Sequence, residues 1–565
     1  MKSFGNYDMK FTETKRTLSV LIFLLVYFGL ILYFLPVQYA VNDDYAILTE
    51  IKNNVNTSFM SPILGYFLSF LYYLNACIPW YGLFLYFIHF VALYILITTV
   101  LKRNWNKMLS YGFLFIYLVF YLDFLQKVSY NNSSIMLGIT VVVYFLFNIR
   151  NLSNARSFLV GLLFAISYLI RGEAIFFVLC FSAPAFYLEK KYYRKMFYLL
   201  FPAIMIISLH MMTDNFAFSE EQKNFNEFNK LRGAFHCYPV AMDNYNNQNI
   251  LKANNWTKND YWALDAWFFM DERKFNAETM ENIFKYSIQG KSEFNTMLNE
   301  VTGNIKGYYI YYLFAAIFLL LFIPGSSYAS CLIASGYFIY CFSGIVVLQL
   351  FFRFPSHIAA QVFMIMFLVM FFLACSFEIK LSYRRKSIVI ILLVLYLLTL
   401  KIYDISKSIS NTARMIEFFN RVYVVQLNQK YQDGIFILPI MPSFLPIEYS
   451  GPFMEAKLKI NIIPYGWLTY SPSFYKSIKK HLKVDNAYEL FPAIALRNDV
   501  YLMGTEHWMQ FVQIYLNETF GNKYRLMRIA QLGGWTIGKD HLSIFVVKEG
   551  TNSGLSRNAA HQTVN

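Results

Sequence analysis

Residues Leu18–Phe34, LSVLIFLLVYFGLILYF, form a long apolar run that is followed shortly by Asn42-Asp43-Asp44-Tyr45. An apolar run of this length predicts a helix that crosses most of a bilayer core of about 30 Å. The two adjacent carboxylates then lie at or just beyond the membrane–water boundary, beside an apolar wall. A carboxylate there can take a proton from a hydroxyl, or hold a divalent cation, next to a lipid-borne substrate. If the chain has an active site, we expect it here.

The composition is that of a membrane protein. Of 565 residues, 57% are hydrophobic, 20% aromatic and only 15% charged, whereas soluble chains average about 25% charged. Apolar runs of transmembrane length recur as far as about Lys401, which predicts a polytopic α-helical membrane protein. The net charge of +15 does not indicate a nucleic-acid partner, because many of the Lys and Arg residues flank the apolar runs.

Basic residues at the ends of these runs set the orientation. Lys2, Lys10, Lys15 and Arg16 precede the first run, and no small-residue cleavage site follows it, so we expect a cytoplasmic head and a retained first span. The basic clusters between later spans then all fall on the cytoplasmic side. About eleven spans are predicted: Leu18–Phe34, Tyr81–Leu101, Met108–Leu125, Ser133–Asn148, Ser157–Ile170, Ala174–Leu188, Met196–Met212, Gly307–Ile323, Tyr328–Leu350, His357–Phe377 and Ser387–Leu400.

This topology divides the chain into regions. Within the first outer loop, Ser61–Asn75 is apolar but short, which predicts an interfacial or re-entrant helix. Short apolar runs at Gly434–Pro439 and Leu542–Val547 indicate strands, hence a C-terminal α/β or α+β domain. The predicted regions are 1–212, N-terminal transmembrane with the first outer loop at 37–80; 213–306, an extracytoplasmic loop; 307–401, C-terminal transmembrane; 402–550, an extracytoplasmic soluble domain; and 551–565, a disordered tail.

Several polar residues gather at the outer ends of these spans. Charged groups so close to hydrocarbon are costly and tend to line cavities or pathways. Arginine holds phosphate through a planar fork of donors. A nearby Asp can deprotonate an acceptor hydroxyl, or a pair of them can hold a metal that neutralises a phosphate leaving group. The candidates are Asn42, Asp43, Asp44 and Tyr45 after the first span, Arg171 and Glu173 at one outer turn, and Arg353, His357 and Gln361 at another.

Each candidate also has a purely structural interpretation. Asp43 and Asp44 can cap a helix, and Arg171 can pair with Glu173 and do nothing more. Arg353 can anchor the helix end by extending its guanidinium to the head groups, and His357 can be an ordinary hydrogen-bonded histidine. In the C-terminal region, the aromatic, turn-rich stretch Tyr465–Pro472 can stack on a sugar, although such a stretch more often forms domain core.

Taken together, the first outer loop opening with Asn42-Asp43-Asp44-Tyr45, the interfacial helix after it, the many spans and the C-terminal domain resemble the GT-C superfamily of integral membrane glycosyltransferases. Within it the chain looks most like bacterial enzymes that decorate surface polysaccharides. The resemblance implies a polyprenyl-phosphate-linked sugar donor, a glycan, lipid or protein acceptor, and a multi-pass position in the inner membrane with an extracytoplasmic active site.

The resemblance also assigns roles to residues. It implies that Asp43 or Asp44 is the general base or a metal ligand, and that Arg171 and Arg353, with His357 beside the latter, bind the donor phosphate. Some members of the superfamily need a divalent metal such as Mg²⁺ or Mn²⁺ and others do not, and this sequence does not decide between them. The long segment Thr213–Lys306 departs from the family pattern and is a candidate cover for an acceptor channel.

Other functions compete with this one. A transporter or flippase of lipid-linked sugars would show interrupted helices near the bilayer midplane and symmetric halves, and neither is evident in the sequence. A polysaccharide polymerase or ligase would share the large external loop but would not need the Asp pair. A non-enzymatic membrane assembly protein is the remaining alternative.

Overall fold

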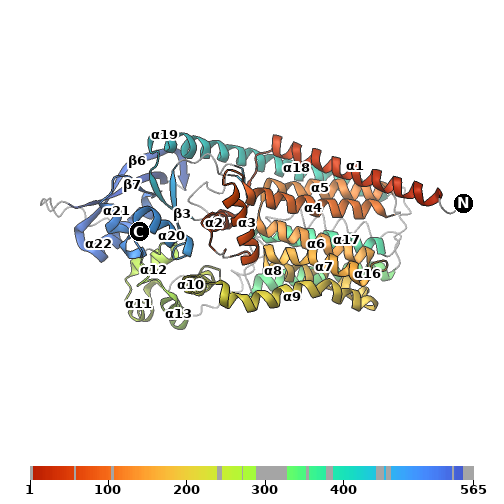
Figure 1. Cartoon of the computed structure of the whole chain (residues 1–565), viewed down its shortest axis with the longest axis horizontal. Coiled ribbons are helices and arrows are strands. Elements are labelled where there is room, and N and C mark those ends of the chain that lie inside the picture. Colours follow the sequence, from red (N-terminus) through yellow and green to blue (C-terminus); the bar gives the residue numbers. More distant parts are fainter. Residues whose placement is uncertain are drawn as a thin grey trace.

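The chain forms two parts joined through a short helical layer. The computed structural model describes residues 4–55, 57, 59–103, 107–237, 245–269, 271–287, 328–351, 356–376, 386–440, 451–453, 460–537 and 540–550. A long helical bundle occupies one half of the molecule, and a sheet with its own helices occupies the other (Figure 1). Helices α2 (Asn42–Lys52) and α3 (Pro62–Leu74) lie between the two parts.

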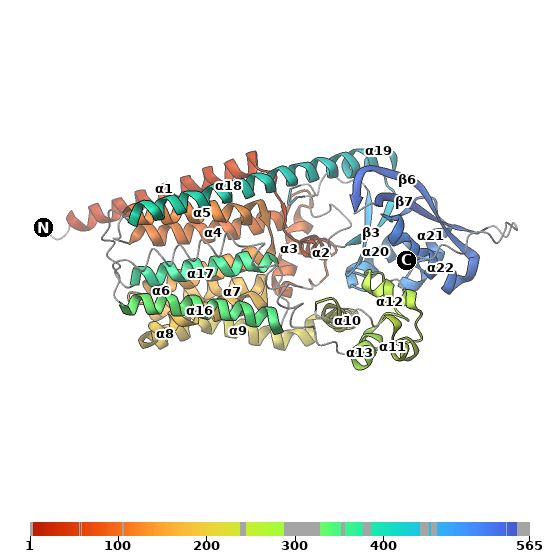
Figure 2. The same ribbon diagram turned by 180° about the vertical axis from the view of Figure 1, so that it is seen from behind.

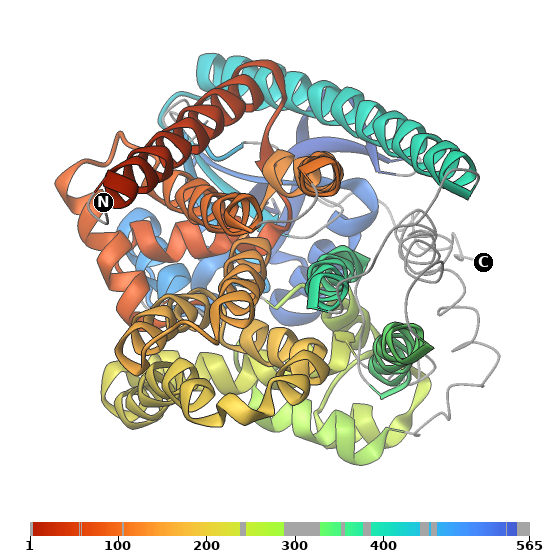
Figure 3. The ribbon, with the colours of Figure 1, turned by 90° about the vertical axis from the view of Figure 1, so that its right-hand side faces the viewer.

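The bundle is organised around helix α6. This helix packs against α4, α7, α8 and α17, and 89% of its apolar window is buried, compared with 22% for α1. In the view along the bundle, the red α1 and the teal α18 lie at its outer edge (Figure 3). Helices α16, α17 and α18 lie in front when the molecule is turned by 180° (Figure 2). The bundle helices are α1 (Phe4–Phe34), α4 (Trp80–Lys102), α5 (Lys107–Gln126), α6 (Tyr130–Asn148), α7 (Asn154–Ile170), α8 (Gly172–Leu188), α9 (Tyr193–Ala217), α16 (Tyr328–Phe351), α17 (Ser356–Ser376) and α18 (Lys386–Phe419).

Four helices within the described ranges are long and apolar enough to cross a membrane, judged by length and composition. They lie at Thr14–Phe34, Trp80–Lys102, Tyr130–Asn148 and Lys190–Met212, and further apolar helices are shorter. Large apolar side chains such as Leu25 on α1 are more than half exposed, as lipid-facing residues are. The predicted total of about eleven spans stays a prediction, since the span at 307–323 lies outside the described residues.

The basic ends of the spans gather at one end of the bundle. The Arg16 guanidinium donates to the Leu101 carbonyl at 3.1 Å, and Arg103 stacks over the Phe147 ring at 5.4 Å. The Lys195 ammonium donates to the Ile149 carbonyl at 2.7 Å. This end lies away from α2 and α3, so the charge distribution is the one that the positive-inside rule requires. Which side of the membrane it faces stays a prediction.

The C-terminal part is built on a five-stranded sheet of order β4-β3-β5-β7-β6. Strand β3 pairs in parallel with β4 and β5, and β7 pairs antiparallel with β5 and β6. Both apolar runs quoted from the sequence are strands here, in β3 and β7. The elements are β3 (Ile435–Ile440), β4 (Asn461–Gly466), α20 (Pro472–Leu482), η6 (Ala487–Glu489), α21 (Leu490–Ala495), β5 (Val500–Thr505), α22 (Glu506–Phe520), β6 (Tyr524–Ile537) and β7 (Asp540–Glu549).

The segment after α9 folds onto this sheet domain. It forms α10 (Glu220–Cys237), α11 (Gln248–Ala253), α12 (Lys258–Asp265) and α13 (Ala277–Tyr286). Its aromatic side chains share one buried cluster with the sheet domain, in which Phe268 packs against Trp508 at a ring distance of 5.5 Å. The Trp508 indole also donates to the Ala266 carbonyl at 3.1 Å. The described part of the predicted outer loop is therefore structured and forms one folded unit with the sheet domain.

Candidate active site

A two-stranded parallel ladder brings the first outer loop to the core of the bundle. Strand β1 (Gln38–Tyr39) pairs with β2 (Lys127–Val128), immediately before α2 and α6 respectively. The Ser61 amide also donates to the Leu169 carbonyl at 2.9 Å, which ties the same loop to the end of α7. The starts of α2 and α6 and the α7–α8 turn consequently meet at one end of the bundle.

Asp44 lies at the centre of this junction and is fully buried. Its Oδ1 accepts hydrogen bonds from the Tyr81 hydroxyl at 2.7 Å and from the Tyr130 amide at 2.9 Å, so it joins α2 to α4 and α6. Its Oδ2 is buried and has no hydrogen-bond partner among the described residues. Burial raises the pKa of the Asp44 carboxyl well above its usual range; these two hydrogen bonds oppose the shift in part.

Asp43 occupies a different environment, half-buried and next to cationic and hydroxyl groups. The Tyr130 hydroxyl donates to Asp43 Oδ2 at 3.3 Å, and the Arg171 guanidinium donates to the same hydroxyl through Nη1. Arg171 Nε pairs with Glu173 Oε2 at 2.9 Å, and the Glu173 side chain is 69% exposed. Arginine, tyrosine and aspartate thus form one continuous polar chain, with Asp43 at its end.

Aromatic rings hold the Arg171 guanidinium in place. It lies 5.0 Å from the Tyr130 ring centroid and 5.4 Å from that of Phe59, both within the range of a cation–π contact. Phe59 also packs against Trp467 of the sheet domain, with 5.2 Å between the ring centroids. The C-terminal domain therefore reaches the same cluster and covers it from outside the bundle.

The remaining sequence candidates divide into three groups. The Gln361 amide donates to the Asn132 side chain, which places it beside the start of α6. Tyr45 is half-buried and packs between the clusters of the sheet domain. Arg353 and the side chains of Asn42 and His357 lie outside the described residues, so their predicted roles remain predictions.

Sequence reasoning overlooked Tyr130, which touches both carboxylates and Arg171. The predicted span began at Ser133, so Tyr130 was counted as loop. The polar triplet Tyr130-Asn131-Asn132 immediately before an apolar run is the signal that could have identified it, since it resembles the placement of Arg171 and Glu173. Tyr81 and Phe59 gave no such signal, because aromatic residues are common at membrane boundaries.

The carboxylates make a poor cage for a metal ion. No group of three or more His, Cys, Asp or Glu side chains that could hold a metal occurs in the described parts of the chain. At the predicted pair, Asp44 Oδ1 already accepts two hydrogen bonds, and the buried acid is held toward its neutral form. A Mg²⁺ ion bound here would take most of its ligands from substrate phosphate and water, which is a common arrangement for that ion.

The chain was compared with known proteins. Its sequence matches no protein-family model and no curated protein sequence. Its fold is similar to the crystal structure of ArnT from Cupriavidus metallidurans bound to undecaprenyl phosphate, with a TM-score of 0.38 and 10% identity over 94% of this chain and 98% of that chain.

Proposed function

We propose that this chain is a GT-C-type membrane glycosyltransferase, which moves a monosaccharide from a polyprenyl-phosphate-linked donor to an extracytoplasmic glycan, lipid or protein. One observation carries the proposal: the Arg171–Tyr130–Asp43 chain at the end of the bundle that adjoins α2 and α3, beside the buried Asp44. It combines an anion-binding group and a candidate base at one end of the membrane helices, which is where a lipid-linked phosphate would present its head group.

In the proposed reaction the acceptor hydroxyl attacks the anomeric carbon of the donor sugar. Asp43 takes the hydroxyl proton as the new bond forms, and the bond between that carbon and the phosphate oxygen breaks. The electron pair leaves with the polyprenyl phosphate. The Arg171 guanidinium stabilises the charge that develops on the departing phosphate, and the Tyr130 hydroxyl orients the Asp43 carboxylate by donating to it.

Asp44 has a positioning role in this scheme. It touches no solvent, and its hydrogen bonds fix the start of α6, from which Tyr130 projects. Arg353 and His357 complete the proposed set as further donor-phosphate ligands. A divalent cation, where one is required, would be held by Asp43 and would neutralise charge on the departing phosphate.

The test is transfer of label from a panel of radiolabelled polyprenyl-phosphate hexoses to a membrane acceptor extract. We compare wild-type protein with Asp43→Asn and with Glu417→Gln, a matched removal of one exposed carboxylate on α18. Transfer by the wild type and by Glu417→Gln, with loss in Asp43→Asn, supports the proposal. Absence of transfer from every donor by folded wild-type protein favours the transporter, polymerase or ligase alternatives.

A further inference from the structure

A large cleft lies between the α2–α3 layer, helices α10 and α13, and the sheet domain. Its volume is about 1120 Å³, and its walls come from the end of the α2 segment, from α10 and α13, and from the start of α20. Drug-sized ligands occupy sites of roughly 300–1,000 Å³, so this cleft has room for something larger. Asn54 in its wall follows α2, a helix of eleven residues that begins beside Asp43. At 1.5 Å per residue along the helix, the wall of the cleft at Asn54 lies about 16 Å from Asp43, the proposed base.

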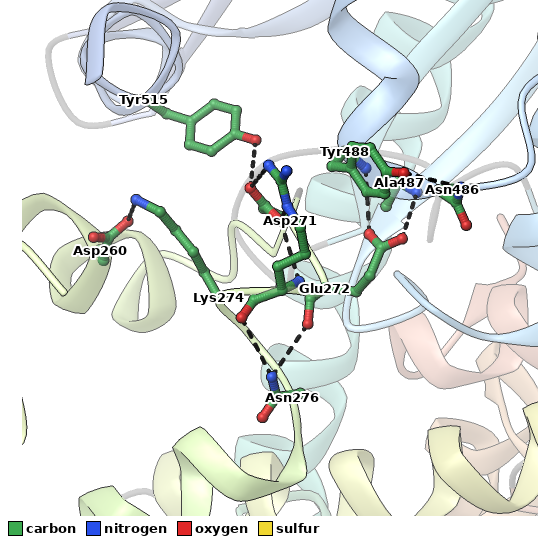
Figure 4. Close-up of polar contacts among 10 residues, drawn as sticks. Asp260, Asp271, Glu272, Lys274, Asn276, Asn486, Ala487, Tyr488 and Tyr515 are labelled. Carbon is green, nitrogen blue, oxygen red and sulfur yellow. Dashed lines mark hydrogen bonds and ion pairs between the residues drawn. The ribbon is translucent and has the colours of Figure 1, made fainter. Parts of the chain in front are cut away.

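The cleft is acidic although the whole chain is strongly basic. Five carboxylates and two lysines line it: Glu221, Glu227, Glu272, Glu278, Asp485, Lys476 and Lys479. Two of the carboxylates already have protein partners. Glu272 accepts from the Ala487 and Tyr488 amides at 3.2 Å each (Figure 4), and Asp485 pairs with Lys479 at 2.8 Å. The side chains of the other three, Glu221, Glu227 and Glu278, are exposed.

Two buried polar atoms in the wall lack partners within the described part of the chain. They are the hydroxyl of Tyr470, whose residue is 6% exposed, and the Oε1 of Gln222, whose residue is 1% exposed. Tyr470 also has a φ of +72°, which is uncommon for a residue other than glycine and costs energy. Two buried polar atoms without partners at the wall of one cavity indicate a binding site, in which a polar ligand supplies the missing hydrogen bonds.

Aromatic rings stand beside the carboxylates. Tyr66 of α3 is 47% exposed and Tyr475 of α20 is half-buried, and both line the cleft. Flat rings offer an apolar face to the C–H side of a sugar, while carboxylates and hydroxyls accept and donate hydrogen bonds around its edge. Tyr470 and Pro472 of the aromatic, turn-rich stretch at residues 465–472 also line the cleft, but the ring of Tyr470 is buried, so the exposed ring faces are those of Tyr66 and Tyr475.

We propose that this cleft binds the acceptor as a saccharide chain without anionic groups, and that it favours sugars bearing amino groups. The excess of carboxylates over lysines attracts ammonium groups and repels phosphate, sulfate or carboxylate groups on a ligand. That this saccharide is the acceptor rests on the proposed function. That the cleft binds an uncharged or amino-bearing saccharide does not.

The test is calorimetric titration of the full-length protein in detergent with three tetrasaccharides. They are a glucosamine tetramer, its N-acetylated neutral counterpart and a sulfated tetrasaccharide. We expect the amino-bearing probe to bind most tightly, the neutral probe more weakly, and the sulfated probe weakest or not at all. The double variant Glu227→Gln/Glu278→Gln should weaken binding of the amino-bearing probe about tenfold or more, because it removes two exposed carboxylates that attract the ammonium groups.

Controls separate the cleft from general charge and from folding. Glu281→Gln removes an exposed carboxylate from the same α13 without lining the cleft, and it should bind like the wild type. Tyr470→Phe deletes one hydroxyl and should weaken all probes that bind. Equal or tighter binding of the sulfated probe, wild-type binding by the double variant, or no binding of any probe overturns the inference. Saccharide binding without transfer from any donor contradicts the proposed function but leaves the cleft assignment intact.

Discussion

Replacing Asp43 and Asp44 one at a time separates a chemical role from a positioning role. Asp44→Ala removes the acceptor of two buried donors, the Tyr81 hydroxyl and the Tyr130 amide. A buried donor left unsatisfied costs about 1–3 kcal/mol, so the free energy of unfolding should fall by about 2–6 kcal/mol. Asp44→Asn keeps one acceptor oxygen but places an amino group where Oδ2 has no partner, which should cost about 1–3 kcal/mol.

Asp43→Asn should behave in the opposite way. Its side chain is half-buried and its amide oxygen can still accept from Tyr130, so the unfolding free energy should change by less than about 1 kcal/mol. The amide cannot take a proton, and loss of a general base lowers the rate about 10²–10⁴-fold. The expected pattern is therefore a stable, inactive Asp43 variant and a destabilised Asp44 variant.

The assay pairs thermal unfolding in detergent, followed by intrinsic fluorescence, with label transfer measured well below each unfolding midpoint. An Asp44→Ala protein that unfolds at the wild-type temperature would refute the assigned hydrogen bonds. An Asp43→Asn protein that transfers at the wild-type rate would show that the proton goes elsewhere. Partial transfer by folded Asp44→Asn agrees with a positioning role for Asp44. Complete loss of transfer in Asp44→Asn, with transfer retained in Asp43→Asn, would make Asp44 the base and Asp43 the positioning residue.

Three further predictions concern the same cluster. Arg171→Lys keeps the charge but loses the planar fork that reaches Tyr130 and Glu173 together, so kcat/KM for the donor should fall about tenfold or more, with a fall in kcat; an unchanged kcat/KM counts against the phosphate role. Because burial raises the pKa of Asp44, the folded state holds a proton that the unfolded state releases above about pH 4. Wild-type stability should therefore fall with rising pH relative to Asp44→Asn, and parallel pH profiles of the two midpoints would contradict this. Transfer should persist in excess EDTA, because the Arg171 guanidinium supplies the positive charge that a metal ion would otherwise bring to the departing phosphate; loss of transfer that added Mg²⁺ restores would contradict this.

The location of the cluster could be predicted from the sequence, because successive spans cross the bilayer in alternate directions and this fixes which span ends lie on the same side. Asp43, Arg171 and Glu173 were identified from their position next to long apolar runs, and the structure brings them to one junction. The division of labour between Asp43 and Asp44 was not predictable in this way. It depends on the β1–β2 ladder, whose strands are two residues each and leave no periodic signal.

A charged residue also misled the sequence analysis at the end of the last span. Lys401 looks like the end of an apolar run, so the soluble domain was predicted to begin at residue 402. The helix α18 continues to Phe419, and within it the Lys401 side chain is fully buried, where its ammonium pairs with Asp123 of α5. Interhelical pairing across distant segments is invisible to a hydropathy pattern, so a buried lysine and a flanking lysine look alike.

Because Asp43 and Asp44 are neighbours on one helix, their carboxylates face different surroundings and have different roles. In a helix, neighbouring side chains point about 100° apart, since a turn holds 3.6 residues. At the start of α2 this angle sends Asp44 into the bundle toward Tyr81, while Asp43 turns toward Tyr130 and Arg171. Tyr130 then contributes to both, through its amide to Asp44 and its hydroxyl to Asp43. A shift of α6 caused by losing Asp44 would therefore move the hydroxyl that contacts Asp43, so a stability defect at the buried residue should reappear as a loss of turnover at its neighbour.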